Sequence, residues 1–221
     1  LIAGSDQIWR PAYNRDIQNM FLSFADSEST KKIAYAASFG TSEWEYTPDL
    51  ESKCRNLIND FDHISVREES GVQLCKDHFD VNATWVLDPT MLLNQSDYKR
   101  FCTSPKIQDQ YIFVYILDSN PDIISNIEAY AKKKNLKVVM KSADSSVSKN
   151  DSIEQWLSLI ANANLVITDS FHGTVFSLIF EKQFFTIVNN ERGASRFESL
   201  SSLLPIKDRI ISENIVFNES Q

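Results

Sequence analysis

The sequence predicts an α/β protein made of two Rossmann-like, doubly wound halves, and three observations support this. Short apolar runs alternate with amphipathic stretches along the chain, which is the pattern of parallel strands joined by helices. Polar clusters rich in Ser, Asp, Arg or His directly follow several apolar runs, as is typical where ligands bind at strand carboxyl ends. With 221 residues, 43% of them hydrophobic, the chain can bury one large core or two smaller ones.

The first half alternates strand and helix from its first residue. Leu1 begins in what reads as the middle of a strand, so we expect the N-terminal part of this half to be missing. A polar loop with Trp9 and Pro11 follows. Leu50, Leu57 and Ile58 have helical spacing. The expected strands are 1–3, 32–38, 61–66 and 84–87, and the expected helices are 48–61 and 68–77.

A polar stretch over residues 94–110, which contains Pro105, separates the halves. We therefore predict that residues 1–97 are the C-terminal part of a first Rossmann-like domain and that 98–221 form a second. The second half repeats the alternation. Its expected strands are 111–117, 136–140, 165–168 and 184–188, and its expected helices are 123–134, 152–161, one from 174, and 195–203.

Composition excludes several classes of function. A formal net charge of −8 argues against a nucleic-acid-binding surface, and no apolar run reaches the roughly 18 residues that a membrane span needs. Cys54, Cys75 and Cys102 lie far apart, without a CxxC pair or a nearby His at ligand spacing, so we expect reduced thiols and no metal site. The five glycines are scattered, which rules out a P-loop or a dinucleotide fingerprint in these residues.

The segment from Asn164 to Leu178 carries the strongest functional signal. A buried-strand run ends in Thr-Asp-Ser-Phe-His-Gly, and a second apolar run with helical spacing follows. His172 is therefore expected at a helix N-terminus, as an acid/base group or an anion contact, although a structural role in capping the helix is the alternative. Asp169 and Ser170 are explained equally well as helix caps or as ligands of sugar or phosphate oxygens. A Ser/His/Asp hydrolase is rejected because GxSxG is absent.

Arginines occur at two further helix starts. Arg67 can clamp a phosphate or carboxylate through two hydrogen bonds, and its alternative is an ion pair with Glu68, Glu69 or another carboxylate. Arg192 and Arg196 form a second basic cluster, which could equally be a solvated loop. In so acidic a chain, these three arginines predict a local positive pocket.

A polar cluster also follows the first strand. Ser5, Asp6 and Gln7 lie at its carboxyl end, where Asp6 could act as a general base, hold a sugar hydroxyl, or simply close the turn. Asp88, before Pro89, is most simply a turn residue. His63 and His78 are expected to be surface or packing residues.

Taken together, these motifs make the chain resemble the polysaccharide pyruvyl transferase family. The resemblance spans nearly the whole chain and rests on six ordered segments: 4–9 (GSDQIW), 34–40 (AYAASFG), 64–68 (ISVRE), 88–90 (DPT), 168–173 (TDSFHG) and 192–197 (RGASRF). It implies a fold similar to two-domain GT-B glycosyltransferases. It also implies transfer of pyruvate from phosphoenolpyruvate onto two hydroxyls of a sugar or lipid-linked glycan, forming a cyclic ketal without a cofactor.

One position departs from the family pattern. Better-known members place Arg two residues before the motif His, where this chain has Ser170. The donor-binding role then falls to Arg67, Arg192 or Arg196. We expect a cytoplasmic enzyme, working also at the inner face of the membrane through a glycan-assembly complex. The expected catalytic residues are His172 and Asp6, and the expected substrate-binding residues are Arg67, Ser170, Gly173, Thr174, Arg192, Arg196, Ser5 and Ser38.

We expect the imidazole and guanidinium groups to converge on a cleft between the two halves. Two other functions stay open at this point. A GT-B glycosyltransferase would use the same turns to hold the diphosphate of a nucleotide sugar. A non-catalytic carbohydrate-binding domain would bind sugar without any donor.

Overall fold

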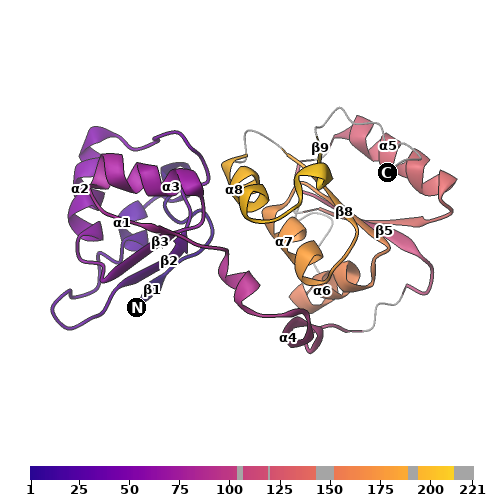
Figure 1. Cartoon of the computed structure of the whole chain (residues 1–221), viewed down its shortest axis with the longest axis horizontal. Coiled ribbons are helices and arrows are strands. Elements are labelled where there is room, and N and C mark those ends of the chain that lie inside the picture. Colours follow the sequence, from indigo (N-terminus) through magenta and orange to yellow (C-terminus); the bar gives the residue numbers. More distant parts are fainter. Residues whose placement is uncertain (104–106, 119, 143–151, 189–193, 212–221) are drawn as a thin grey trace. The chain divides into compact units, whose positions relative to one another are not determined.

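The computed structural model describes residues 1–103, 107–118, 120–142, 152–188 and 194–211. The described residues of 1–92 and 190–205 form one compact unit, and those of 93–189 and 206–221 form a second. Each unit contains a parallel sheet (Figure 1), which has four strands in the first unit and five in the second among the described residues. The expectation of an α/β protein is confirmed, and both sheets are compatible with a Rossmann-like fold.

The sheet of the first unit follows chain order. Strands β1 (Ile2–Ala3), β2 (Ile33–Ala37), β3 (His63–Val66) and β4 (Thr84–Trp85) pair as β1-β2-β3-β4. Helices α1 (Ile17–Met20), α2 (Pro48–Ile58) and α3 (Glu69–Leu74) connect them, and a π-helical turn at Cys75–Phe79 follows α3. Because the strands are parallel, their carboxyl ends all lie at one edge of the sheet.

Aromatic rings fill the core of this unit. Trp9, expected in a polar loop, is fully buried and stacks on Phe21 with ring centroids 4.9 Å apart. Phe39 and Phe79 belong to the same cluster. Burial among these apolar groups raises the pKa of the Cys75 thiol to about 12, so this thiol stays protonated and inert at neutral pH.

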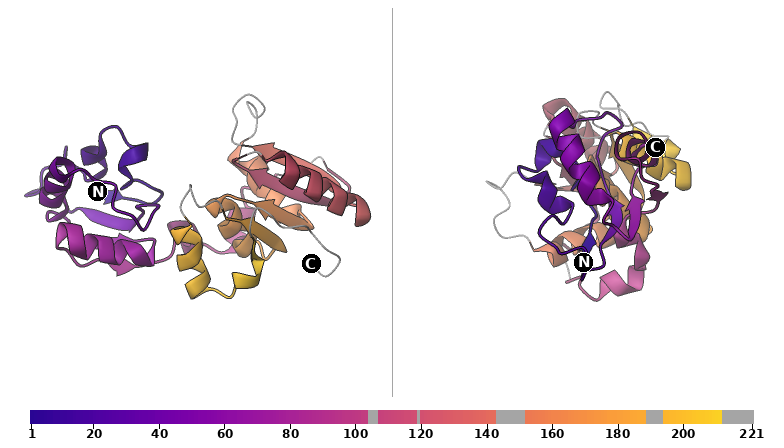
Figure 2. Two further views of the ribbon diagram at one scale, coloured as in Figure 1. Left: turned by 90° about the horizontal axis from the view of Figure 1, so that it is seen from above. Right: turned by 90° about the vertical axis from the view of Figure 1, so that its left-hand side faces the viewer.

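The second unit has a doubly wound sheet. Its strands β5 (Tyr111–Ile116), β6 (Lys137–Ser142), β7 (Leu165–Thr168), β8 (Phe184–Ile187) and β9 (Ile210–Ile211) pair in the order β6-β5-β7-β8-β9. The order reverses between β5 and β7, and such switch points are where open α/β sheets bind ligands. Helix α5 (Pro121–Lys133) packs against β6 (Figure 2), and α6 (Ile153–Asn162) packs against α7 (Phe171–Ile179).

Several elements differ from the sequence prediction. Helix α7 begins at Phe171 and not at Thr174, so the predicted turn residues His172 and Gly173 lie in its first turn. The polar stretch before β5 contains a short helix, α4 (Gln95–Lys99), which starts with a capping box between Asn94 and Asp97. Helix α8 (Ser195–Leu203) is as predicted but belongs to the first unit. Among the helices described, none combines the length and apolar character needed to span a bilayer.

Candidate functional site

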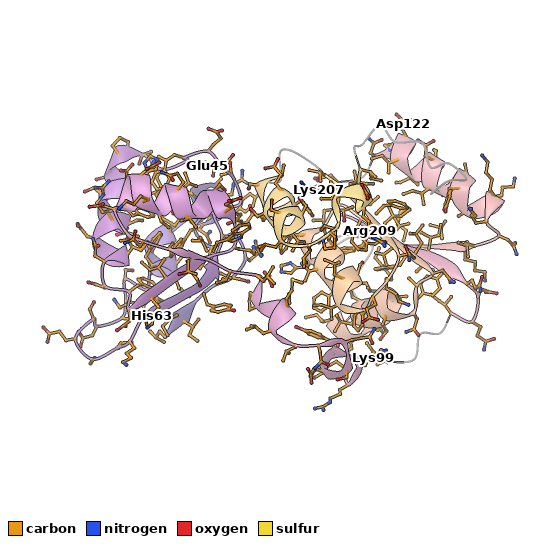
Figure 3. The ribbon with its side chains drawn as sticks, in the orientation of Figure 1. Glu45, His63, Lys99, Asp122, Lys207 and Arg209 are labelled. Atoms are coloured by element: carbon orange, nitrogen blue, oxygen red, sulfur yellow. The ribbon has the colours of Figure 1, made fainter. Side chains whose placement is uncertain are left out.

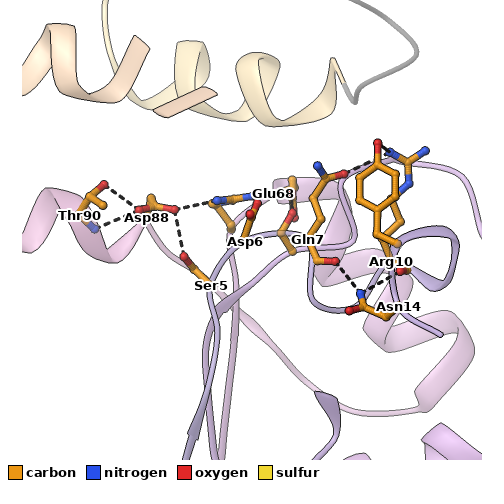
Figure 4. A network of polar contacts seen from close by, with 11 residues as sticks. Ser5, Asp6, Gln7, Arg10, Asn14, Glu68, Asp88 and Thr90 are labelled. Carbon is orange, nitrogen blue, oxygen red and sulfur yellow. Dashed lines mark hydrogen bonds and ion pairs between the residues drawn. The ribbon is translucent and has the colours of Figure 1, made fainter. Parts of the chain in front are cut away.

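The carboxyl ends of the four strands in the first unit carry a cluster of polar side chains (Figure 4). Each strand contributes at least one member, which follows its last residue by one to three positions. These residues are Ser5 and Asp6 after β1, Ser38 after β2, Arg67 and Glu68 after β3, and Asp88 after β4. Ser5 and Asp88 are 83 positions apart in the sequence, and parallel strand pairing brings them together.

Arg67 is the centre of this cluster. Its side chain is almost fully buried, and Nη1 donates to Oδ2 of Asp88 at 2.7 Å. Nη2 lies 3.4 Å from Oδ1 of Asp6, whose side chain is 68% exposed. The Nε atom is 4.0 Å from Oε1 of Glu68. Arg67 therefore forms the ion pair with a carboxylate that the sequence offered as the alternative to a phosphate clamp, and its main partner is Asp88.

Asp88 holds Arg67 in place. The sequence indicated a turn residue, but its buried carboxylate also accepts a hydrogen bond from Ser5 Oγ at 3.2 Å. Its other oxygen accepts from the backbone N–H and the hydroxyl of Thr90, at 3.0 and 2.7 Å. These donors satisfy a charge that would otherwise be costly to bury, so Asp88 is a rigid support for the guanidinium.

Glu68 is a buried carboxyl group beside the arginine. Burial, its largest influence, raises its pKa, while the charges of Arg67 and Arg196 and a hydrogen bond from Ser38 act in the opposite direction. Ser38 Oγ donates to Oε1. The second oxygen, Oε2, is buried and has no hydrogen-bond partner among the described residues.

Arg196 adds a second buried guanidinium from the first turn of α8. Burial, the largest influence, and the positive charge of Arg67 together lower its pKa to about 10, although Glu68 and Asp6 act to raise it. An anion bound beside both arginines would relieve this unfavourable burial and repulsion. Arg192, the other predicted member of the pair, lies outside the described residues.

His172 lies in the second unit, in the first turn of α7. Ser170 is the N-cap of this helix, because its Oγ accepts a hydrogen bond from the backbone N–H of Gly173 at 3.3 Å. The capping role considered from the sequence thus belongs to Ser170. His172 is partly exposed, and its ring contacts that of Phe171 edge to face. Its predicted role in catalysis stays a prediction.

The neighbours of His172 shape the strand-to-helix junction. Both carboxylate oxygens of Asp169 accept backbone N–H bonds from the loop after β5, at 2.7 and 3.0 Å, so this side chain joins the two strands at the switch point. Gly173 lets α7 approach β7, because a Cβ atom there would overlap Thr168. Thr174 is fully buried, with its hydroxyl 2.7 Å from that of Thr186. These contacts position the first turn of α7.

The other two histidines have ordinary surroundings. His63, labelled in Figure 3, is exposed at the start of β3. His78 stacks on Trp44 with ring centroids 3.8 Å apart. Within the described ranges, no three His, Cys, Asp or Glu side chains are grouped so that they could hold a metal ion.

The structure thus brings five of the predicted site residues together in the first unit: Ser5, Asp6, Ser38, Arg67 and Arg196. It places Ser170, His172, Gly173 and Thr174 together at the start of α7 in the second unit. Sequence reasoning missed Asp88 and Glu68 as members of the cluster. Their position just after a strand was the signal that could have identified them. In the first unit, the buried guanidinium groups of Arg67 and Arg196 can bind an anion, and a nearby carboxyl group such as that of Asp6 can accept or donate a proton.

Comparison with known proteins identifies the family. The family model described as polysaccharide pyruvyl transferase matches residues 1–191 of the 221-residue chain. The match covers the strand-end residues from Ser5 to Asp88 in the first unit and the start of α7 in the second, and Arg196 lies beyond it. No curated protein matches the chain significantly. The family is one of transferases that act on polysaccharides, and because its model covers well over half of this sequence, the chain belongs to the polysaccharide pyruvyl transferase family.

Proposed function

We propose that this chain transfers pyruvate from phosphoenolpyruvate onto two hydroxyls of a sugar or lipid-linked glycan, forming a cyclic ketal, on a GT-B-like fold. We place the reaction in the cytoplasm or at the inner face of the membrane. The observation that carries the proposal is a pair of buried guanidinium groups whose charges repel each other: Arg67 at the carboxyl edge of a parallel sheet and Arg196 in the first turn of α8.

The donor explains why two arginines that repel each other are both buried in the first unit. Phosphoenolpyruvate carries both a phosphate and a carboxylate, and each can accept a pair of hydrogen bonds from a guanidinium. Arg67 forms a short ion pair, 2.7 Å, with the buried carboxylate of Asp88. Its contact with Asp6 is longer, 3.4 Å, and the Asp6 side chain is largely exposed. A donor anion can therefore replace Asp6 while Asp88 keeps Arg67 oriented.

The reaction needs one proton delivered to the donor and two removed from the acceptor. Protonation of the donor's methylene carbon generates an oxocarbenium-like centre at the neighbouring carbon, which one sugar hydroxyl attacks. The bond from that carbon to the phosphate oxygen then breaks, phosphate leaves, and the second hydroxyl closes the ketal. We assign His172 as the general acid or as the group that stabilises the departing phosphate, and Asp6, once displaced from Arg67, as the base for a hydroxyl.

Ligand titration tests this proposal directly. We expect calorimetry to show binding of phosphoenolpyruvate and no binding of UDP or GDP, because a nucleotide diphosphate is the product of the alternative glycosyltransferase reaction. Incubation with phosphoenolpyruvate and candidate glycans should then release inorganic phosphate only when an acceptor is present. Binding of UDP or GDP in place of phosphoenolpyruvate would support the glycosyltransferase, and sugar binding without any donor would support a non-catalytic domain.

A further inference from the structure

The first unit also contains a cavity whose lining residues do not include the two arginines. Its volume is about 850 Å³, and its walls come from α3, β4 with the residues before it, and α8. Ligand pockets in proteins typically measure about 300–1,000 Å³, so the cavity is large enough for a sugar residue. Six lining residues carry the argument: Glu69, Ser70, Trp85, Ser195, Glu198 and Ser202.

Two serines that line this cavity have hydroxyl groups without a partner among the described residues. The Oγ atoms of Ser70 and Ser195 are buried, and neither has a hydrogen-bond partner in the described part of the chain. Ser195 as a whole is only 7% exposed. Buried polar atoms are almost always hydrogen-bonded, so two unsatisfied hydroxyls on residues that line one cavity point to a ligand that supplies the missing donor or acceptor.

The charge of the walls differs from that of the strand-end cluster. Glu69 and Glu198 line the cavity, and no Arg or Lys does so among the described residues. These carboxylates would repel an anionic donor, whereas they are good acceptors for neutral hydroxyl groups. The ligand is therefore expected to be uncharged and rich in hydroxyls.

Trp85 adds a flat apolar surface to these hydroxyls and carboxylates. Its indole N–H donates to the backbone carbonyl of Arg67 at 3.2 Å, which fixes the ring. An aromatic ring beside hydroxyl and carboxylate groups matches a sugar, which has one apolar C–H face and a polar rim. We infer that this cavity is a subsite for a neutral sugar residue of the acceptor glycan.

The inference rests on the proposed function for its acceptor role, because the subsite adjoins the proposed donor site along the chain. Ser70 follows Arg67 by three residues, and Ser195 directly precedes Arg196. The beginnings of α3 and α8 therefore carry an arginine of the donor cluster together with an unpartnered hydroxyl of the cavity. A glycan residue held here would lie beside the residues that bind the donor.

The test compares two tryptophan substitutions in the last turns of α8. Ser202 is exposed and lines the cavity, so Ser202→Trp should fill it without disturbing the core. Leu203 is also exposed but does not line the cavity, so Leu203→Trp is the matched control. The probes are three neutral tetrasaccharides built from glucose, galactose and mannose, titrated into the full chain by calorimetry. Phosphoenolpyruvate is titrated separately.

At least one tetrasaccharide should bind the unmodified chain, with affinity at least tenfold lower in Ser202→Trp and unchanged in Leu203→Trp. Ser195→Ala should also weaken sugar binding without lowering the melting temperature, because the lost hydroxyl has no hydrogen-bond partner among the described residues. Failure of all three sugars to bind, or equal affinity in the two tryptophan variants, would overturn the subsite. Sugar binding that depends on the cavity, in a chain that does not bind phosphoenolpyruvate, would instead reject the proposed donor and leave the subsite standing.

Discussion

The ion pair between Arg67 and Asp88 offers the sharpest test of the donor site, because its structural and binding roles make different predictions. Arg67→Met leaves the Asp88 carboxylate buried without its cation. Breaking a buried pair from one side typically costs about 3–5 kcal/mol. Ser5 and Thr90 still donate to Asp88, so we expect about 3 kcal/mol. Asp88→Asn should cost about 2 kcal/mol, because Asp6 and Glu68 remain near the guanidinium.

Donor affinity separates the two single variants. If Arg67 binds phosphoenolpyruvate, Arg67→Met loses a charge-assisted hydrogen bond of about 1.5–3 kcal/mol. That loss corresponds to a roughly 10- to 150-fold weaker affinity. Asp88→Asn keeps the cation and removes a neighbouring negative charge, so its affinity should be equal or higher. Equilibrium urea unfolding gives the stabilities, and calorimetric titration at low ionic strength gives the dissociation constants.

The double variant, which combines Arg67→Met with Asp88→Asn, completes a double-mutant cycle. With both charges removed, the stability loss should be smaller than the sum of the single losses by about 2 kcal/mol, because neither partner is left buried and unpaired. Its donor affinity should match that of Arg67→Met. The donor-binding role of Arg67 is refuted if both single variants bind phosphoenolpyruvate as tightly as the unmodified chain, or if both lose affinity in proportion to stability.

Three further predictions follow from single residues. His172→Ala should lower turnover by about 10²–10⁴-fold with phosphoenolpyruvate affinity retained, whereas the exposed control His63→Ala should change neither; full turnover would remove His172 from the mechanism. Gly173→Ala should destabilise the chain by about 1–3 kcal/mol in urea unfolding, because the new Cβ would overlap Thr168. Glu68→Gln should gain stability relative to the unmodified chain as pH rises. The pKa of Glu68 in the folded chain lies above its usual 4.5, so the free energy of unfolding of the unmodified chain falls as pH rises from about 4.5 through that folded-state pKa. The Gln variant cannot lose this proton, so the same pH dependence of stability in both proteins would contradict the prediction.

The sequence predicted most strands and helices because parallel strands buried on both faces read as continuous apolar runs. The start of α7 was placed three residues late, because Gly173 reads as a breaker when its neighbours are unknown. In the structure it is required for close packing of α7 against Thr168. The short helix α4 was missed inside a polar stretch, although the spacing of Asn94 and Asp97 is a recognisable capping box.

The site was less predictable because partners across a sheet depend on strand pairing. Arg67 and Arg196 could be selected as residue types at helix starts, but their burial near one another depends on α8 belonging to the first unit. Asp88 reads as a turn residue before Pro89, and only the pairing of β3 with β4 places it against Arg67. The polar residues that follow successive parallel strands were the usable signal.

Because residue 170 is Ser and not Arg, the proposed donor-binding charges and the proposed acid catalyst lie in different units of this chain. A serine at this position can cap α7 by accepting a hydrogen bond from the backbone N–H of Gly173, which a long, charged arginine side chain cannot do. The first turn of α7 therefore gains a cap in place of the expected cation. The described guanidinium groups of the proposed donor site, Arg67 and Arg196, belong to the first unit, whereas the imidazole of His172 belongs to the second. Donor affinity and acid catalysis should consequently be separable by mutation: substitution of Arg67 or Arg196 should act on the dissociation constant for the donor, and substitution of His172 on turnover.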